Sequence, residues 1–301
     1  MSAIRELERA SDSRGLGRAQ INLAAIHGIA CNSRAQERAA ELAIAHYANA
    51  GFSPAVCYAS LASALYHGPV PVATALARCA ALLESVNDRM TEANLAVVLG
   101  GLHGLRGDFA EARRLLDHAR SVFADLGQRA AVDTILDPHA VALERWAGNI
   151  EEAARICQDN FERLSAADNR AYASTRAVQL ADLLLDLGDA DRAEQYIRFA
   201  DERAIRSDVL VQFLRRAQRA RLLARTGRHE DAESLAREAV AIASLTDVLL
   251  DRARTHAALA EVLTASGANR EAKRETAEAA RLLTKKGLNA KESPAGSLSH
   301  L

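Results

Sequence analysis

The chain has 301 residues, more than one compact core usually serves, so either two domains or a stacked array of repeats is expected. Its 38 basic side chains balance 39 acidic ones, which leaves no global field to attract nucleic acid or anionic lipid. No uninterrupted apolar run approaches ~18 residues, and no basic region precedes an apolar core at the N-terminus, so a soluble cytoplasmic protein is expected.

Residues 1–15 open the chain with a short helical pattern. Ile4, Leu7 and Glu8 have helical spacing, and the pattern ends in the polar run Ser11–Gly15. No partner helix precedes this segment. We expect either the second half of a hairpin that belongs to a longer array or a capping helix.

A helical corner then recurs along the chain, and its clearest copy lies at residues 105–116. A leucine-rich helix is expected to stop at Gly107, and Asp108 and Glu111 have the spacing of a capping box for the next helix. Corner glycines recur at steps of 39 to 41 residues, at Gly28, Gly68, Gly107, Gly148, Gly188, Gly227 and Gly267. Five residues after each glycine stands a small residue, Ser33 in the first copy and alanine in the others, which lets two helices cross closely.

The period predicts an all-α fold. Loops between the corners keep the same rhythm, so fourteen helices of about 15 to 19 residues should form seven antiparallel pairs. Each pair has an apolar stripe that only the next pair can cover, and residues 1–287 are therefore expected to stack into a right-handed, tetratricopeptide-like α-solenoid. Gly100, Gly101 and Gly104 interrupt one helix, so either backbones touch there or the solenoid flexes. Residues 288–301 lack periodicity and are expected to be a disordered tail.

Several stretches resemble one known family. They are Leu99-Gly-Gly-Leu-His-Gly-Leu-Arg-Gly-Asp-Phe-Ala-Glu-Ala-Arg113, Arg170–Thr175, Arg221–Val240 and Leu259–Leu263. They look like the C-terminal tetratricopeptide-like region of actinobacterial signalling proteins with adenylate or guanylate cyclase or ATPase domains, and related arrays occur in ATP-binding LuxR-type activators. The resemblance covers residues 90–287 well. It implies a regulatory, partner-sensing arm without catalytic residues. After Gly287 the sequence no longer follows the family pattern, so the DNA-binding domain that follows such arrays in some relatives is not expected here.

No catalytic, cofactor or metal site is expected. No glycine precedes a lysine as a phosphate-binding loop requires, and no histidines pair at i, i+4. The cysteines Cys31, Cys57, Cys79 and Cys157 are too widely spaced for a metal site and are expected to be buried free thiols. Trp146, the only tryptophan, is expected in the core, with an exposed interaction anchor as the alternative.

Polar residues recur at equivalent positions on the first helices of the fifth, sixth and seventh pairs. These residues, which we call the strip, are Arg176, Gln179, Asp182, Asp186, Arg215, Gln218, Arg221, Arg225 and Glu261. Because equivalent helices are neighbours in a stack, Asp182 is expected to face Arg221, Arg221 to face Glu261, and Asp186 to face Arg225. The strip is either a ladder of exposed ion pairs, which is the favoured interpretation, or a concave surface that docks an acidic or mixed-charge partner.

Two functions follow from this pattern. The first is a non-catalytic protein-interaction module, the regulatory scaffold of a bacterial signalling or transcription-regulating protein. The alternative is a sensor that binds a small anionic effector near Arg176, Arg215 and Trp146. An enclosed pocket lined by these residues would favour the sensor, and an open groove would favour protein binding. Neither direct nucleic-acid binding nor membrane binding is expected, and the sequence leaves the partner and the oligomeric state open.

Overall fold

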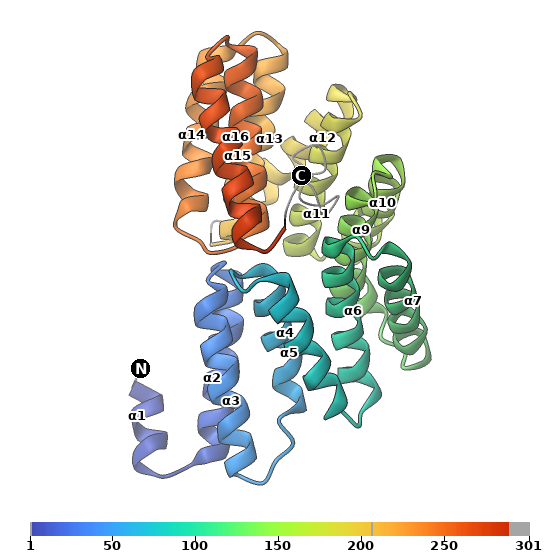
Figure 1. Cartoon of the computed structure of the whole chain (residues 1–301), viewed down its shortest axis with the longest axis vertical. Coiled ribbons are helices and arrows are strands. Elements are labelled where there is room, and N and C mark those ends of the chain that lie inside the picture. The colour runs from blue at the N-terminus through green and yellow to red at the C-terminus, as the bar shows by residue number, and fades with distance from the viewer. Residues whose placement is uncertain (1, 206, 289–301) are drawn as a thin grey trace.

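The computed structural model describes residues 2–205 and 207–288, and within these ranges it is all-α without strands. Seven antiparallel pairs follow one another along the chain (Figure 1). They are α2 (Ser13–Ile29) with α3 (Ser33–Asn49), α4 (Tyr58–His67) with α5 (Val72–Glu84), α6 (Arg89–Arg106) with α7 (Phe109–Asp125), α9 (Asp137–Trp146) with α10 (Ile150–Ala166), α11 (Arg170–Asp186) with α12 (Ala190–Arg203), α13 (Val209–Arg225) with α14 (His229–Ser244), and α15 (Leu249–Ala265) with α16 (Asn269–Lys285). The predicted α-solenoid of seven hairpins is confirmed.

Short elements complete the chain. Helix α1 (Ser2–Arg9) packs against α2, the turn η1 (Ala55–Cys57) precedes α4, and α8 (Arg129–Ala131) with the π-helical turn η2 (Val132–Leu136) precedes α9. These turns take up residues at the starts of the second and fourth pairs. Helices α4 and α9 are therefore only 10 residues long, and α5 and α12, with 13 and 14 residues, are also shorter than the predicted range. The tail expected over 288–301 lies outside the described residues, apart from Leu288.

The five later corners are built as the sequence predicts. Their glycines have positive φ angles between 79° and 91°, a conformation that costs glycine little, and the alanines five residues later are buried at the helix crossings. The predicted capping box of Asp108 and Glu111 is wrong, because the Asp108 side chain makes no cap hydrogen bond to α7. Its carboxylate instead accepts from Arg106 Nε at 2.6 Å and lies 3.2 Å from His103 Nδ1.

The first two corners differ from the prediction. Gly28 lies inside α2, and Cys31 takes the left-handed conformation with φ +54°. Gly68 caps α4 in an extended conformation, and α5 starts only after Pro71. This shift of the helix start leaves Ala73 exposed.

The glycines inside α6 mark close packing between helices. A Cβ atom on Gly101 would lie 2.5 Å from His139 Cδ2 and 2.9 Å from Tyr66 Cε2. We expect Gly101→Ala to lower the free energy of unfolding by about 1–3 kcal/mol, because both rings are packed and would have to move. Urea unfolding followed by circular dichroism measures the change.

The matched control for this substitution is Gly28→Ala. Gly28 is also helical, but its added Cβ would meet only the flexible side chain of Gln36, at 3.2 Å. Helix propensity alone then makes Gly28→Ala neutral or stabilising. Equal effects of the two substitutions would show that α6 does not depend on its glycines for packing.

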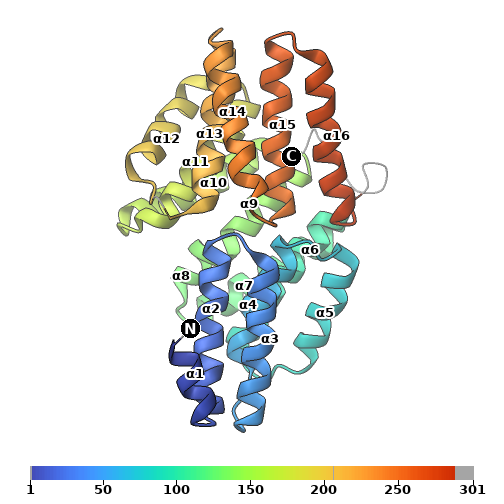
Figure 2. The ribbon, with the colours of Figure 1, turned by 90° about the vertical axis from the view of Figure 1, so that its left-hand side faces the viewer.

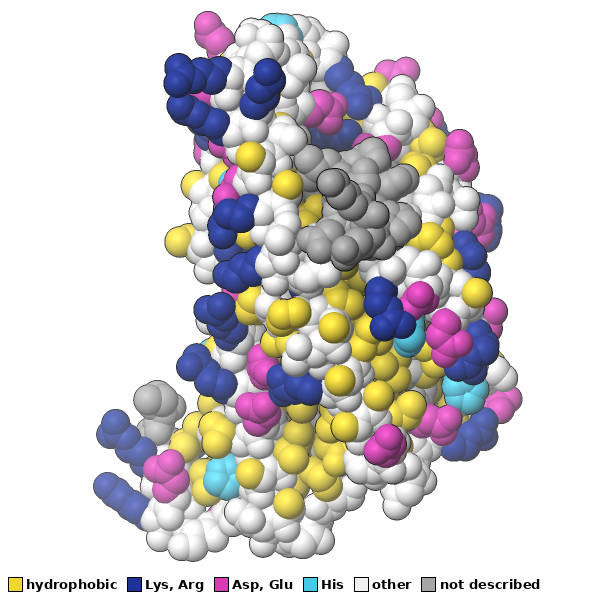
Figure 3. All heavy atoms as spheres, in the orientation of Figure 1, with side chains coloured by type: hydrophobic (Ala, Val, Ile, Leu, Met, Phe, Trp, Pro, Cys, Tyr) yellow, Lys and Arg dark blue, Asp and Glu magenta, His cyan; other side chains and the backbone are white. Residues whose placement is uncertain are grey.

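The solenoid curves until its last pairs lie above its first pairs, as Figures 1 and 2 show from two sides. Along the stack, α4 packs on α6, α6 on α9, α11 on α13, and α13 on α15. One hydrophobic cluster joins the two ends of the stack, because Leu249, Leu250, Leu282 and Leu283 pack with residues of the first three pairs. Figure 3 shows one face of this body, with hydrophobic side chains gathered over α4 and α5. No described helix combines the length and the apolar character needed to cross a membrane.

Candidate functional site

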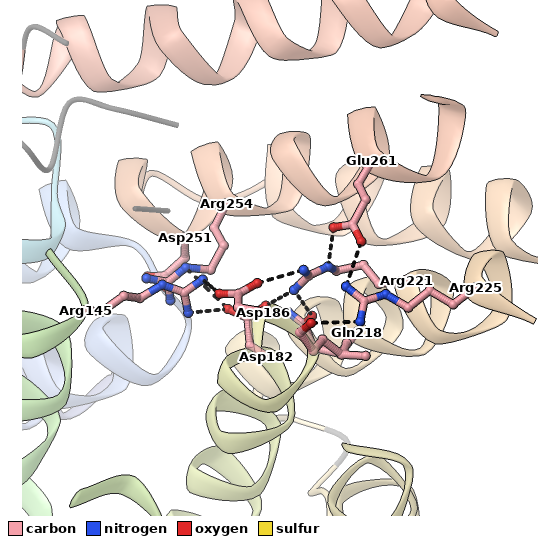
Figure 4. A network of polar contacts seen from close by, with 10 residues as sticks. Arg145, Asp182, Asp186, Gln218, Arg221, Arg225, Asp251, Arg254 and Glu261 are labelled. Carbon is pink, nitrogen blue, oxygen red and sulfur yellow. Dashed lines mark hydrogen bonds and ion pairs between the residues drawn. The ribbon is translucent and has the colours of Figure 1, made fainter. Parts of the chain in front are cut away.

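The centre of the strip is a four-membered charge cluster. Arg145 donates from Nη1 to Asp182 at 2.7 Å and from Nη2 to Asp186 at 2.7 Å. Arg221 donates to the other oxygens of the same two carboxylates, at 2.6 and 2.8 Å (Figure 4). Charge-assisted hydrogen bonds with this bridging geometry are short and strong. The cluster therefore ties α9, α11 and α13 together.

The cluster continues toward the seventh pair. Arg221 Nε donates to Glu261 on α15 at 2.6 Å, and Gln218 lies 3.3 Å from Arg221 Nη1. Arg225 also reaches Glu261, at 3.2 Å, and donates to the Leu185 carbonyl at 2.7 Å. The predicted pairs Asp182–Arg221 and Arg221–Glu261 are confirmed. The predicted pair Asp186–Arg225 is wrong, because Arg145 and Arg221 already hold the Asp186 carboxylate.

The ladder is largely buried, and the expectation that its ion pairs are exposed is wrong at its centre. Arg145, Asp182, Gln218 and Arg221 are all buried. Burial raises the pKa of Asp182, but the nearby Arg145, Arg221 and Arg254 lower it by more, so the net pKa lies below its usual value. Burial likewise lowers the pKa of Arg221, and its carboxylate partners raise it above its usual value. The cluster therefore stays ionised.

Sequence reasoning missed Arg145, Asp251 and Arg254. Arg254, on α15, lies 3.8 Å from Asp182 on α11 and 3.9 Å from Asp251. The contact between Arg254 and Asp182 passes over α13, which lies between α11 and α15 in the stack, so it depends on how tightly the stack curves. Arg145 stands next to Trp146, outside the register used for the strip, and a wider search for arginines near the corner glycines would have found it.

The remaining strip residues do not join the cluster. Arg215 donates to Asp201 at 2.7 Å and to Gln212 at 2.9 Å, on the side of α12, and Gln179 is half-buried. Arg176 is only 5% exposed, and its Nε and Nη1 atoms find no hydrogen-bond partner. Burial lowers the pKa of Arg176. The strip thus divides into a satisfied cluster and a separate, incompletely bonded arginine.

One end of the cluster reaches the surface. The side chains of Asp186, Arg225 and Glu261 are 26%, 32% and 38% exposed, and all three lie toward the corner end of pairs five to seven. We call these three residues the exposed end of the strip. Their side chains are held in place by the buried cluster behind them, so charges of both signs are presented in a fixed arrangement.

The other expected features are placed as follows. Trp146 is buried, with its ring centroid 6.5 Å from that of Tyr66, so the prediction that it belongs to the core is confirmed. The four cysteines are buried free thiols, as predicted. No group of three or more metal-ligating side chains gathers within the described ranges.

A cavity of about 520 Å³ opens away from the strip, between the start of α11 and the end of α12. It is lined by Ser165, Asp168, Asn169, Arg170, Ala173, Phe199, Glu202 and Arg203. Its lining therefore includes none of Arg176, Arg215 and Trp146.

No protein-family model matches the chain, and no curated protein matches it significantly. The structure is similar to BtubC from P. vanneervenii, with a TM-score of 0.48 and 18% identity over 72% of this chain and 89% of that chain. It is also similar to a signal transduction ATPase with a tetratricopeptide repeat sensor from Pyrococcus horikoshii, with a TM-score of 0.49 and 12% identity over 96% of this chain and 49% of that chain. Likeness at this level says nothing about function.

Proposed function

We propose that this protein is a non-catalytic protein-interaction module, a regulatory scaffold in bacterial signalling or transcriptional control. Stacked helical hairpins give a long surface whose side chains are held by a regular backbone, which suits recognition of an extended partner. We assign no catalytic residue and place the module in the cytoplasm. Its resemblance to the tetratricopeptide-like arms of actinobacterial cyclase-type and LuxR-type proteins supports a signalling role.

The exposed end of the strip is the observation that carries this proposal. The Arg225 side chain is partly exposed there, beside the partly exposed carboxylates of Asp186 and Glu261. Because the buried cluster fixes these side chains in advance, a partner segment loses little side-chain entropy on the module's side when it binds. Charges of both signs at fixed positions favour a partner segment that itself carries charges of both signs.

Charge reversal at Arg225 tests the proposal. We expect Arg225→Glu to reduce recovery of the bound partner from a bacterial lysate by roughly tenfold, because like charges would then meet across the interface. Affinity capture followed by quantitative mass spectrometry measures recovery against the wild-type protein.

Arg237→Glu is the matched control. Arg237 is also exposed and paired, to Glu233 and Glu271, but it lies on the outer helix α14. Both variants should have the same thermal midpoint to within a few degrees, since surface ion pairs contribute little to stability. Equal recovery from the two variants would remove the exposed end of the strip from the proposed interface.

A small-anion sensor is the second candidate, and Arg176 is the observation that favours it. Its guanidinium has unpaired donors inside the protein, and a carboxylate or phosphate could satisfy them. The Nε and Nη1 atoms are inaccessible in this arrangement, so such a ligand would require movement of the surrounding helices. For this reason we rank the interaction module first.

A further inference from the structure

The last two hairpins contact the first two through the apolar cluster described above and through two sets of polar contacts, which we call the seam. The seam joins Cys31–Arg34 to Thr246–Val248, and Leu65–Val72 to Lys286–Leu288. At the first contact, Asp247 accepts the backbone N–H groups of Ser33 at 2.5 Å and of Arg34 at 2.9 Å. The Asp247 N–H donates to the Cys31 carbonyl at 3.1 Å. A carboxylate from a distant loop thereby caps the start of α3.

At the second contact, Lys286 caps the end of α4. Its ammonium, 0% exposed, donates to the carbonyls of Leu65, Gly68 and Val70 at 2.8, 2.7 and 3.0 Å. Three N–H donors meet three acceptors at a helix C-terminus, an arrangement that favours the ammonium, whereas burial lowers the pKa of Lys286 to about 7. The backbone of Lys286 also accepts from the Val72 N–H at 2.9 Å.

The two contacts obey the repeat. Lys286 follows Asp247 by 39 residues, and Val72 follows Ser33 by the same 39 residues. The seam therefore joins consecutive hairpins of one superhelical turn to consecutive hairpins of the next. In each contact the charge complements the helix dipole: the Asp247 carboxylate lies at the N-terminus of α3, and the Lys286 ammonium lies at the C-terminus of α4. The two turns of the superhelix can therefore form both contacts in only one alignment.

Two charged groups with poor partners lie on the inner face, close to α15. Asp251 on α15 lies close enough to Tyr66 on α4 to raise the pKa of that phenol, to which burial contributes most, and it also lies close to Arg176. Arg176 is buried with unpaired donors. An unpaired buried cation disfavours the closed arrangement, because water or a partner would satisfy it once the halves separate.

We propose that the seam is a reversible closure, with Asp247 and Lys286 holding the superhelix shut over its inner face. Opening exposes Arg176 and the neighbouring part of α15 to an acidic partner segment. The proposal rests on the interaction function above for the identity of the partner, and on the seam contacts for the closure itself.

Native cysteines report the opening. Cys31 lies at the seam, packed in one cluster with Val211 and Phe213 of α13, whereas Cys157 lies within the stack between α10 and α11. Burial, with Asp251 nearby, raises the pKa of Cys31 to about 12, and burial raises the pKa of Cys157 to about 12 as well. Both thiols are therefore unreactive in the closed state, but seam opening frees only Cys31.

Thiol labelling of a Lys286→Met variant tests the closure. We expect N-ethylmaleimide to label Cys31 about tenfold faster or more in this variant than in wild type, the factor for losing a charge-assisted hydrogen bond. Labelling of Cys157 should not change. Lys285→Met is the matched control, since Lys285 is the exposed neighbour, and it should label like wild type. Peptide mass spectrometry resolves each cysteine.

Two results would overturn the closure. One is equal labelling of Cys31 in Lys286→Met and Lys285→Met. The other is equal acceleration at Cys31 and Cys157, which would mean global unfolding. If Lys286→Met does not fold, Lys286→Gln provides the same comparison, because the amide keeps N–H donors for the α4 carbonyls and is a milder change that leaves the surroundings of Cys31 untouched. Labelling needs no partner, so a failed capture experiment with Arg225→Glu leaves this test intact.

Discussion

Replacing Asp182 with alanine is expected to lower the free energy of unfolding by about 3–5 kcal/mol. The Asp182 carboxylate accepts one hydrogen bond from Arg145 and one from Arg221, and all three side chains are buried. Removing it leaves two guanidinium groups short of a partner in the interior, which costs more than the lost ion pairs alone. Urea unfolding at neutral pH, followed by circular dichroism, measures the change.

Asp159→Ala is the matched control for this prediction. Asp159 also pairs with an arginine, Arg155 on the same helix, but both side chains are about half exposed. Such a pair contributes roughly 0.3–0.5 kcal/mol. If the two variants differ by less than about 1 kcal/mol, the central cluster is as weak as a surface pair, and the role given to it in tying three helices together is wrong.

Acid is expected to destabilise the protein between pH 6.5 and pH 4 through two histidines. Burial, with Lys286 nearby, lowers the pKa of His67 to about 4, and burial, with His67 nearby, lowers the pKa of His139 to about 4. Because the ordinary histidine pKa is about 6.5, the unfolded chain binds protons in this window and the folded protein does not. The free energy of unfolding that depends on these two neutral rings is fully present above pH 6.5 and is lost as the pH falls to 4.

The size of this effect is about 3 kcal/mol for the two histidines together, roughly half of what the full shifts would give, since both rings are only half-buried by surface area. Asp137, Asp208 and Asp251 act in the opposite direction, because burial raises the pKa of each. Comparing unfolding at pH 7 and pH 5 in His139→Gln and wild type isolates the ring, and the exposed His118 serves as control in His118→Gln. A pH dependence unchanged by His139→Gln would contradict the assignment.

The architecture could be read from the sequence because its signals are local. Gly148, Gly188, Gly227 and Gly267 each end a helix by their own conformation, and each following alanine sits at its own crossing. The early corners were misplaced because other residues perform the same task there. Cys31 takes the left-handed conformation in place of Gly28, and prolines around residue 70 delay the start of α5.

The candidate site was predictable only along the repeat. Asp182, Arg221 and Glu261 stand about one repeat apart on adjacent helices, so the period alone brings them together. Arg254 reaches Asp182 across two pairs, and Lys286 reaches α4 after nearly a whole turn. Both contacts depend on the curvature of the stack, which comes from the summed shapes of many side chains and leaves no periodic mark in the sequence.

The seam also changes how the protein should come apart. In an open repeat array, each unit contacts only its neighbours, so terminal units fray first and unfolding spreads inward. Here Leu249, Leu250, Leu282 and Leu283 share a cluster with the first three pairs, and Lys286 and Asp247 cap helices near the start. Truncating either terminal hairpin would therefore weaken the opposite terminus, and the array should melt in a single cooperative transition, as a globular domain does.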